Sequence, residues 1–436
     1  MSREACCIFL ISPVFKLQSL RMNIASLGAL QMFNFALTFA TLPYLARTLG
    51  VAGWGHVVFV QLIINYLMWV ANWGFYLGAT KRIATVRADR EALSRIFVVT
   101  WVAQCCLTGL LVGALVISIN VLTMLADNKV LYLAGAGLLL GNALTPLWYL
   151  NGLEKIRESA ITQIAVKILA LPLIFTLVQE KSETATYLAI NSACAVTVGM
   201  FTMWRIYRSG AIRWHWPHLR EVSTTLAQES HLFISTLWGN LNGSLIPTIL
   251  GIVGGAAELG YYNLADRARS AAIAILNPIT HALFPRMCYL FQHDKAQALR
   301  LLKRSGVVML VLSGSMSVTL LLFTSDILGV LGGNDFRSGA SALMWLAFTP
   351  VFTTTSSFII HQILVPSGNT QGFNKAMFLT LLLNALLVVP AVSFLGAQGA
   401  AIASFSTELF ATIYLIIYVW QQKLVAAYSE SNGVRN

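Results

Sequence analysis

Residues 96–119 read IFVVTWVAQCCLTGLLVGALVISI, an apolar stretch without a single Asp, Glu, Lys or Arg. A helix of about 20 residues crosses the ~30 Å hydrocarbon core of a bilayer, so this stretch predicts a membrane-spanning helix. Residues 306–323 and 400–420 are stretches of the same kind, and Glu408 is the one charged residue in them. Soluble proteins break up their apolar runs every few residues, and the sequence therefore indicates a membrane protein.

Similar apolar runs recur along the whole chain of 436 residues, of which 57% are hydrophobic and only 11% are charged. We count about twelve runs and expect an all-α polytopic membrane protein, with two pseudo-symmetric six-helix lobes around a central cavity. The expected parts are a cytoplasmic lead-in (1–22), an N-terminal lobe (23–207), a cytoplasmic linker (208–230), a C-terminal lobe (231–422) and a cytoplasmic tail (423–436).

The formal net charge of +12 reflects basic residues that are spread over alternate connections between the apolar runs. The connections at 81–95, 154–159, 205–230 and 286–304 hold most of the Lys and Arg, whereas the intervening connections hold few or none. Under the positive-inside rule this bias predicts that both termini are cytoplasmic. The dispersal of the charge argues against a nucleic-acid partner.

A weak internal echo indicates two related halves. Pro43 is followed by Trp54-Gly55, and Pro247 by Leu259-Gly260, and the two patterns lie about half a chain apart. Each pattern falls where the first span of a half gives way to the second, as expected for parallel repeats about the membrane normal.

Motifs for catalysis are missing from the sequence. There is no H-E-x-x-H, no Gly-rich phosphate loop, no G-x-S-x-G elbow, no G-x-G-x-x-G and no C-x-x-C pair. The polar connections are also too short for the separate domain that membrane-embedded glycosyltransferases commonly carry. We therefore expect free thiols, no metal or cofactor, and a protein that is not an enzyme.

Function is then expected to lie in the few ionisable groups within the predicted spans, each of which costs roughly 2.5–3.5 kcal/mol when it faces lipid at the bilayer centre. Lys167 lies in mid-span, where it either lines a cationic cavity or joins neighbouring helices. Asp266 and Arg269 are three positions apart and can pair on one helix face, while Arg267 points elsewhere without a nearby partner. Glu408 is either a proton or cation site or the partner of a buried base.

Five further polar residues complete the candidate set. Arg47 ends the first span, where snorkelling to the interface is the alternative to a place in the cavity. The other four are amides that either line a shared cavity or join neighbouring helices. They are Gln31 and Asn34 in the first span and Asn240 and Asn242 in the seventh.

Longer motifs occur in both halves. They are Leu42-Pro-Tyr-Leu-Ala-Arg-Thr-Leu-Gly50, Trp54-Gly55, Asn72-Trp-Gly-Phe75, Ala79-Thr-Lys-Arg-Ile-Ala84, Pro146-Leu-Trp-Tyr-Leu-Asn-Gly-Leu-Glu154, Leu259-Gly-Tyr-Tyr262, Ala265-Asp-Arg267 and Ala282-Leu-Phe-Pro-Arg286. With these motifs, residues 22–425 resemble the polysaccharide biosynthesis flippases, the Wzx type of the multidrug/oligosaccharidyl-lipid/polysaccharide exporter superfamily. The family often has Gln in the place of Asn151.

The resemblance implies a flippase of the bacterial inner membrane that moves undecaprenyl-pyrophosphate-linked oligosaccharide repeat units from the cytoplasmic to the periplasmic leaflet by alternating access, as in O-antigen, lipopolysaccharide and exopolysaccharide biosynthesis. The implied partners are this lipid-linked oligosaccharide, the lipid bilayer, a polysaccharide polymerase and a chain-length regulator. The implied cationic cavity is assigned to Lys167, Arg267, Arg269 and Arg47. Glu408 and Asp266 are the candidates for coupling transport to proton or sodium entry.

The alternative function is a cation-coupled antiporter that exports drugs or other small solutes, which the same superfamily also contains. A cationic interior repels the organic cations that such antiporters usually export, and this favours the flippase. The third possible class is a structural subunit of an export assembly, and it predicts that replacing the charged residues of the cavity has no effect on function.

Overall fold

The computed structural model describes residues 17–122 and 128–422, and within them the side chains of all residues but 17–35, 38, 295 and 370. The predicted tail (423–436) and most of the predicted lead-in (1–22) lie outside this part of the chain, as do the side chains of Gln31 and Asn34. The described residues are helical and contain no strand, which confirms the predicted all-α class.

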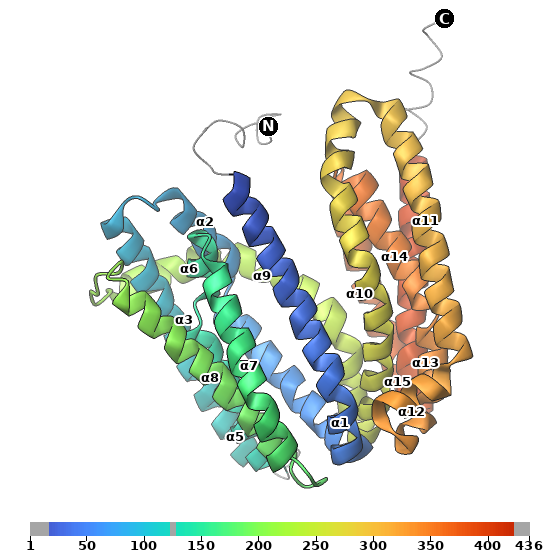
Figure 1. The fold of residues 1–436 in the computed structure, drawn as a ribbon, viewed down its shortest axis with the longest axis horizontal. Coiled ribbons are helices and arrows are strands. Elements are labelled where there is room, and N and C mark those ends of the chain that lie inside the picture. Colours follow the sequence, from blue (N-terminus) through green and yellow to red (C-terminus); the bar gives the residue numbers. More distant parts are fainter. Residues whose placement is uncertain (1–16, 123–127, 423–436) are drawn as a thin grey trace, which may run out of the picture.

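The chain forms long helices together with several short ones (Figure 1). The apolar runs form helices because a helix satisfies its own backbone hydrogen bonds where no water is available. In order, the elements are α1 (Leu17–Asn72), α2 (Phe75–Thr85), α3 (Arg90–Val121), α5 (Lys129–Leu144), α6 (Leu147–Gly152), α7 (Ile156–Leu177), α8 (Thr184–Arg208), α9 (Leu219–Val253), α10 (Gly255–His293), α11 (Lys295–Leu322), α12 (Thr324–Gly332), η1 (Asn334–Gly339), α13 (Ala340–Leu346), α14 (Thr349–Ile359), η2 (Ile360–Leu364) and α15 (Thr370–Gln421).

Two of the longest helices are each broken by a glycine. Gly50 in α1 has a φ of 69° and Gly396 in α15 has a φ of 53°, a region of backbone space that residues with a Cβ rarely adopt. At the second break, the backbone N–H of Ala397 donates to Oε2 of Glu258 on α10, over 2.6 Å. This carboxylate satisfies an amide that the break leaves without a helical partner. Helices α1 and α15 therefore each consist of two rods.

Several of these helices are long and apolar enough to span a bilayer. Within the described residues, seven helices are long and apolar enough to cross a membrane, or eight if the bent pair Asn334–Leu346 and Thr349–Leu364 forms one span. Two of the seven, Phe39–Thr85 and Gln371–Gln421, have 47 and 51 residues. Each is long enough for two crossings at about 20 residues per crossing. The chain is thus a multi-pass membrane protein, while its division into twelve crossings and two lobes stays a prediction.

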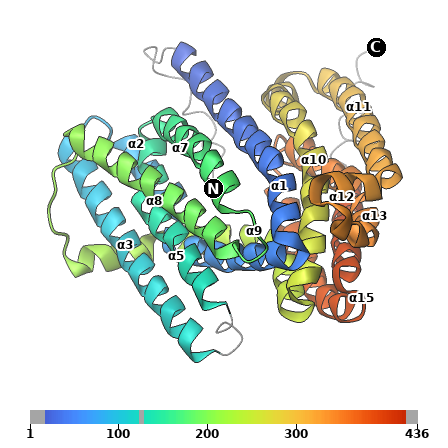
Figure 2. The same ribbon diagram turned by 60° about the horizontal axis from the view of Figure 1, so that its bottom comes forward.

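Helices from the two halves of the chain lie on opposite sides of the molecule. Figure 1 shows α3 to α8 on one side and α10 to α15 on the other, meeting at one end and diverging toward the end where α2 and the α10–α11 connection lie. A second view shows α1 beside α10, and these two helices are in contact (Figure 2). We call the diverging end the basic end and the opposite one the far end. The basic end carries Arg82, Arg95, Arg205, Arg220, Arg300 and Arg304.

Three groups of buried hydrophobic residues account for this shape. One group joins both halves of the chain at the far end, where it includes Leu45, Trp54, Leu259 and Leu343. The other two lie toward the basic end, and they draw separately on residues 75–226 and on residues 276–419. The two sides therefore share a hydrophobic core at the far end, whereas toward the basic end each side has a core of its own.

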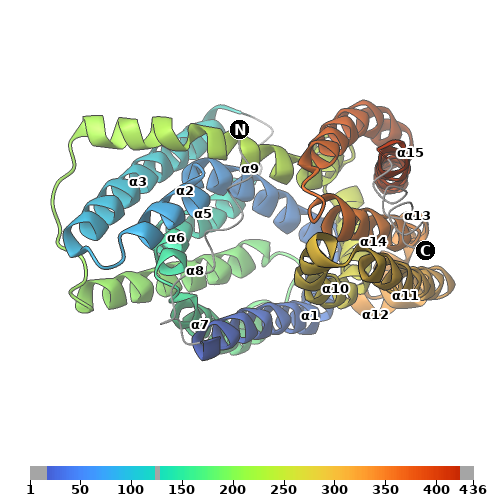
Figure 3. The ribbon, with the colours of Figure 1, turned by 90° about the horizontal axis from the view of Figure 1, so that it is seen from above.

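Helix α9 bridges the two sides. Figure 3 shows it running along α3 and continuing to α15. Near its start, α9 approaches α2 closely, because a Cβ on Gly78 would overlap the carboxylate of Glu229. Oε1 of Glu229 in turn lies 2.9 Å from Nη2 of Arg82. The first part of α9 is therefore fastened to the N-terminal helices by close packing and by an ion pair.

At the far end, α1 and α10 cross with their backbones in contact. A Cβ added to Gly55 would overlap the carbonyl of Ala256, and one added to Gly260 would overlap the carbonyl of Val51. The same sequence offset separates Gly55 from Gly260 and Val51 from Ala256. The two contacts are therefore reciprocal, and the weak echo in the sequence falls at the point where the two halves touch.

Candidate functional site

A cavity of about 570 Å³, which we call the first cavity, lies among α1, α5, α7 and α8. Lys167 from α7 and Arg267 from α10 both line it, although they come from different halves of the chain. The described residues of its lining include no Asp or Glu. Its other polar lining residues are Thr41, Gln61, Asn142, Thr145, Gln163, Tyr187 and Asn191. The first cavity is therefore polar and positively charged.

Arg267 is held in place by a residue of the other half of the chain. Its Nε donates to Oδ1 of Asn263 over 3.1 Å, and the same oxygen accepts from Nε1 of Trp54 over 3.2 Å. The guanidinium also lies over the Trp54 ring, with Cζ 5.3 Å from the ring centroid. A cation–π contact and an amide acceptor both stabilise the cation without neutralising it. Arg267 therefore brings a full positive charge to the first cavity.

Lys167 reaches the first cavity on a face of α7 that it shares with Gln163, one helical turn earlier. Asn191 and Cys194 of α8 complete this part of the lining. An ammonium, two amides and a thiol at one wall provide hydrogen-bond donors for an anion and both donors and acceptors for hydroxyl groups.

A second cavity, of about 320 Å³, lies among α9, α10, α14 and α15. Its charged residues are Asp266, Arg269 and Glu408, so that two carboxylates face one guanidinium. Nη2 of Arg269 lies 2.7 Å from Oδ1 of Asp266, which confirms the predicted pair. Asn384 is 2% exposed, and its Oδ1 has no hydrogen-bond partner among the described residues. The second cavity thus has excess negative charge and an unused oxygen acceptor, which suits a proton or a hard cation.

Two faces of helix α10 line the two different cavities. Asp266 and Arg269 share a face that lines the second cavity, whereas Arg267 is turned by about 100° and lines the first. A single helical turn therefore supplies positive charge to one cavity and an ion pair to the other. Arg269, predicted to belong with Lys167, lies in the second cavity.

Arg47 lies at the far end, away from both cavities. Its Nη2 donates to the carbonyl oxygen of Val330 over 2.7 Å and lies 3.4 Å from that of Gly329, both in α12. Carbonyls at the end of a helix favour a cation. Arg47 therefore links the two halves of the chain at the far end.

The predicted amides are separated in the structure. Asn242 lines the second cavity, whereas Asn240 lines a smaller pocket among α1, α2 and α9. The side chains of Gln31 and Asn34 lie outside the described part of the chain. The sequence analysis also missed cavity residues, chief among them Gln163, Tyr187 and Asn191. The sequence feature that could have identified them is an amide or phenol side chain inside a predicted span, because polar groups there need a hydrogen-bond partner or a water-filled cavity.

Two of the longer motifs are structural. Oδ1 of Asn72 accepts from Nε2 of Gln104 and from Nδ2 of Asn142, each over 3.0 Å. Nε1 of Trp148 donates to Oε1 of Gln104, also over 3.0 Å. This network joins α1, α3, α5 and α6 behind the first cavity. Asn72 and Trp148 therefore hold the helices together, which explains why they belong to motifs without facing a ligand.

The sequence pattern described as "Polysaccharide biosynthesis protein" matches residues 20–291, more than half of the chain. The chain belongs to the polysaccharide biosynthesis protein family. This family member is 28% identical over 410 residues to a putative O-antigen transporter of Escherichia coli (strain K12), which covers 93% of this chain and 98% of that protein. It is 20% identical over 379 residues to a probable low-salt glycan biosynthesis flippase of Haloferax volcanii, covering 86% of this chain and 78% of that protein.

Solved transporter structures share the fold of this polysaccharide biosynthesis protein. An inward-facing multidrug resistance MATE family transporter of the MOP superfamily has a TM-score of 0.65 at 14% identity, over 89% of this chain and 95% of that one. The lipid II flippase MurJ in an inward closed conformation has a TM-score of 0.64 at 13% identity, over 92% and 87%. These relatives are transporters and flippases by name, in agreement with the expectation that the chain is not an enzyme.

Proposed function

We propose that this chain is a flippase that moves undecaprenyl-pyrophosphate-linked oligosaccharide repeat units from the cytoplasmic to the periplasmic leaflet of the bacterial inner membrane. The observation that carries the proposal is the first cavity, where Lys167 and Arg267 share a polar space whose described lining holds no carboxylate. Two cations suit a pyrophosphate, and the surrounding amides and hydroxyls suit sugars. The names of the E. coli and Haloferax relatives support the same class of function.

A polar cavity addresses the main physical obstacle to this reaction. A lipid-linked oligosaccharide cannot cross a bilayer unaided, because its hydroxyls and its pyrophosphate would all leave water together. The first cavity offers these groups replacement hydrogen bonds while the polyprenyl chain stays in lipid. Positive charge at the basic end supports a cytoplasmic position for that end. The divergence of the two sides there would then admit the substrate from the cytoplasmic leaflet (Figure 1).

Two sources of energy are compatible with the proposal. The membrane potential, negative inside, favours outward movement of an anion by about 2.3 kcal/mol per charge per 100 mV. The second cavity adds Asp266 and Glu408 as candidates for proton or sodium coupling, since both lie near Arg269. A proton or sodium ion bound there would weaken the electrostatic attraction between these carboxylates and Arg269 of α10. Because α10 also positions Arg267 in the first cavity, ion binding would act on the helix that contacts the substrate.

Removal of both cations tests the proposal. We expect Lys167→Ala with Arg267→Ala to abolish surface polysaccharide in a strain that lacks the native gene, because the pyrophosphate loses its counter-charges. The measurement is cell-surface glycan at matched protein level in the membrane. Arg300→Gln with Arg304→Gln is the control, since it removes the same charge from exposed positions of α11. Wild-type amounts of glycan in the cavity double variant would contradict the proposal.

The same assay extends to the second cavity. We expect Glu408→Gln to lower glycan export and to remove its dependence on the proton or sodium gradient, since an amide cannot take up the ion. Unchanged export with unchanged gradient dependence would exclude Glu408 as the coupling group.

The second candidate function is a cation-coupled antiporter of drugs or other small solutes, and the acidic second cavity is the observation in its favour. It predicts greater drug susceptibility and normal surface glycan in a deletion strain, whereas the flippase predicts unchanged drug susceptibility and loss of surface glycan. The polymerase and the chain-length regulator remain predicted partners.

A further inference from the structure

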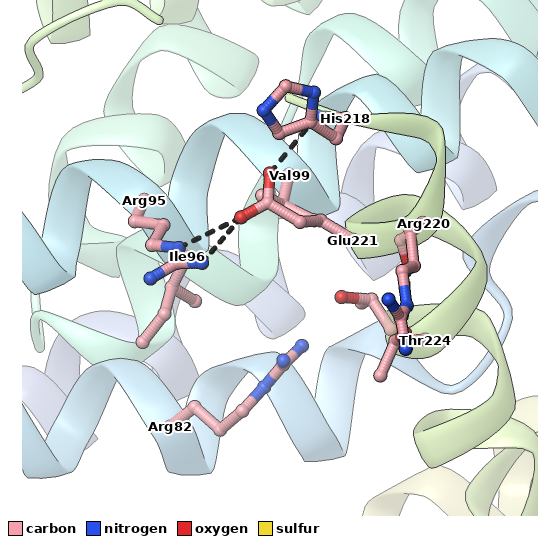
Figure 4. A pocket seen from close by; sticks show the side chains of 9 residues that line it. Arg82, Arg95, Ile96, Val99, His218, Arg220, Glu221 and Thr224 are labelled. Atoms are coloured by element: carbon pink, nitrogen blue, oxygen red, sulfur yellow. Dashed lines mark hydrogen bonds and ion pairs between the residues drawn. The ribbon is translucent and has the colours of Figure 1, made fainter. Parts of the chain in front are cut away.

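A further pocket, of about 540 Å³, lies at the basic end between α2, α3 and the start of α9. Figure 4 shows Arg82 and Arg95 entering it from α2 and α3 on one side, and Arg220, Glu221 and Thr224 from α9 on the other. Neither cavity described above includes any of these residues. We call it the α9 pocket, and nothing in the proposed transport cycle uses it.

The α9 pocket has more arginines than carboxylates. Its described lining contains three arginines and a single acidic residue, Glu221, whose Oε1 forms an ion pair with Arg95 and accepts from its Nε over 3.1 Å and from its Nη2 over 2.5 Å. Arg82 pairs with Glu229, yet its Nε is buried and has no hydrogen-bond partner among the described residues. Arg220 is exposed, and it forms no ion pair within the described part of the chain. Arg82 and Arg95 are thus each paired with one carboxylate, and Arg220 gives the pocket its net positive charge. The guanidinium of Arg220 and Nε of Arg82 remain as donors that no described carboxylate uses.

Unused guanidinium donors around a small pocket suit a phosphate group. Arginine binds the oxygens of phosphate in pairs, through a rigid fork of N–H donors. Thr224 and Thr225 also line the pocket, and the hydroxyl of Thr224 donates to the carbonyl oxygen of Arg220 over 2.7 Å.

One wall of the α9 pocket is apolar. Ile96 and Val99 of α3 form it, and the apolar run of α3 continues from them toward the far end. Farther along α3, large apolar side chains are exposed, with Leu110 72% exposed and Ile117 65% exposed. A ligand with a phosphate at one end and an acyl chain at the other would therefore contact matching surfaces along α3.

The neighbouring tryptophans place the α9 pocket at the level of the lipid headgroups. Trp214 and Trp216 lie in the connection before α9 and are 47% and 81% exposed. The Trp214 ring packs edge-on against that of Trp101 on α3, with 5.7 Å between centroids. Exposed tryptophans of membrane proteins gather at the membrane–water interface.

We propose that the α9 pocket binds the phosphate of an anionic phospholipid, whose acyl chains lie along α3. The bound headgroup bridges Arg82 and Arg95 of the N-terminal helices to Arg220 of α9. Because α9 continues to the helices of the other side, the lipid strengthens the attachment of this bridge at the basic end (Figure 3). The proposal does not depend on the identity of the transported molecule.

Lipid retention and thermal stability of the purified full-length protein test this site. We expect phosphatidylglycerol, and not phosphatidylcholine, to remain bound in native mass spectrometry and to raise the melting temperature in mixed micelles. Arg95→Gln with Arg220→Gln should weaken retention of phosphatidylglycerol by roughly tenfold or more, because each removes a charge-assisted hydrogen bond to the phosphate. Arg82 is left intact, since its loss would leave Glu229 buried without its partner.

Two further variants keep the test decisive. Thr224→Asp retains every arginine but adds a carboxylate to the pocket, and we expect it to lower retention as well. Arg300→Gln with Arg304→Gln, the matched loss of two exposed charges on α11, should leave retention unchanged. Equal retention by wild type and the pocket variants would overturn the proposal, and so would an equal loss in the α11 control. Stabilisation by inorganic phosphate alone equal to that by phosphatidylglycerol would overturn the assignment to a lipid.

Discussion

At the residue scale, Arg267 owes its position to Trp54, which lies in the other half of the chain. The ring and the amide oxygen of Asn263 both attract the guanidinium, and neither carries a formal charge that would cancel it. Arg269, two positions later, is paired with Asp266 instead. Two arginines on neighbouring faces of one helix thus have different roles, because one is neutralised by a carboxylate and the other is not.

The lowered pKa of the Glu221 carboxylate predicts how stability depends on pH. The side chain of Arg95 and then the backbone N–H of His218 donate to this carboxylate, and both lower the pKa of Glu221 below its ordinary value. A carboxylate whose pKa is lowered on folding adds stability above its unfolded pKa, about 4.3, and loses it as the pH falls through the folded value. We expect the difference in melting temperature between wild type and Glu221→Gln to be present at pH 7 and to vanish at acidic pH.

The control for this pH series is Glu91→Gln. Glu91 is an exposed glutamate in the first turn of α3, so its replacement removes the same charge near the same pocket. The prediction would be contradicted if the difference in melting temperature between wild type and Glu221→Gln stayed constant from pH 7 to pH 3. It would also be contradicted if Glu91→Gln gave the same difference with the same pH dependence.

At the scale of elements, the crossing of α1 and α10 depends on small residues. Gly55 and Gly260 bring each backbone against a carbonyl of the other helix, and the turn before each glycine contains a positive-φ glycine, Gly50 or Gly255. Close backbone approach at glycine is a common way to pack membrane helices, because van der Waals contact replaces the hydrophobic effect there. This crossing closes the far end.

Gly55→Ala is predicted to open that crossing. In an ordinary helix interior, replacing Gly by Ala stabilises by about 0.5–1 kcal/mol, but overpacking a contact costs about 1–3 kcal/mol. We therefore expect Gly55→Ala to lower the melting temperature and to reduce glycan export, because α1 and α10 must move apart. Gly113→Ala in α3 is the matched control, since a Cβ there meets nothing within 4 Å. If the two variants melted alike, the crossing would not be a tight contact.

At the scale of the whole molecule, three cores define how the two sides can move. The far-end core contains residues of both halves, while the cores toward the basic end are separate. Opening the far end would expose apolar surface and break contacts such as that of Arg47 with α12. The described arrangement is therefore one in which the far end is closed and the basic end is divided.

Cys194 reports on this arrangement because it lines the first cavity. In a variant that keeps Cys194 as its only cysteine, we expect a membrane-impermeant thiol reagent to label it faster in inside-out than in right-side-out vesicles. The reason is that the basic end, proposed to face the cytoplasm, is the divided end. Labelling with Cys288 as the only cysteine serves as a reference for the basic end of α10. Faster labelling of Cys194 from the periplasmic side would contradict both the orientation and the closure.

The sequence by itself determined the all-α membrane class and the family, and it placed Asp266 and Arg269 on one helix face, where they can pair. Hydropathy and helical periodicity are local properties, so a single segment is enough to reveal them. Only the tertiary structure decided that Arg269 lies apart from the cavity that Lys167 and Arg267 line, that Arg47 instead joins α12, and that α9 forms a basic pocket with α2 and α3. These outcomes depend on which helix faces meet across the two halves. That choice is made by packing between residues far apart in the chain, about which the sequence of one segment carries no information.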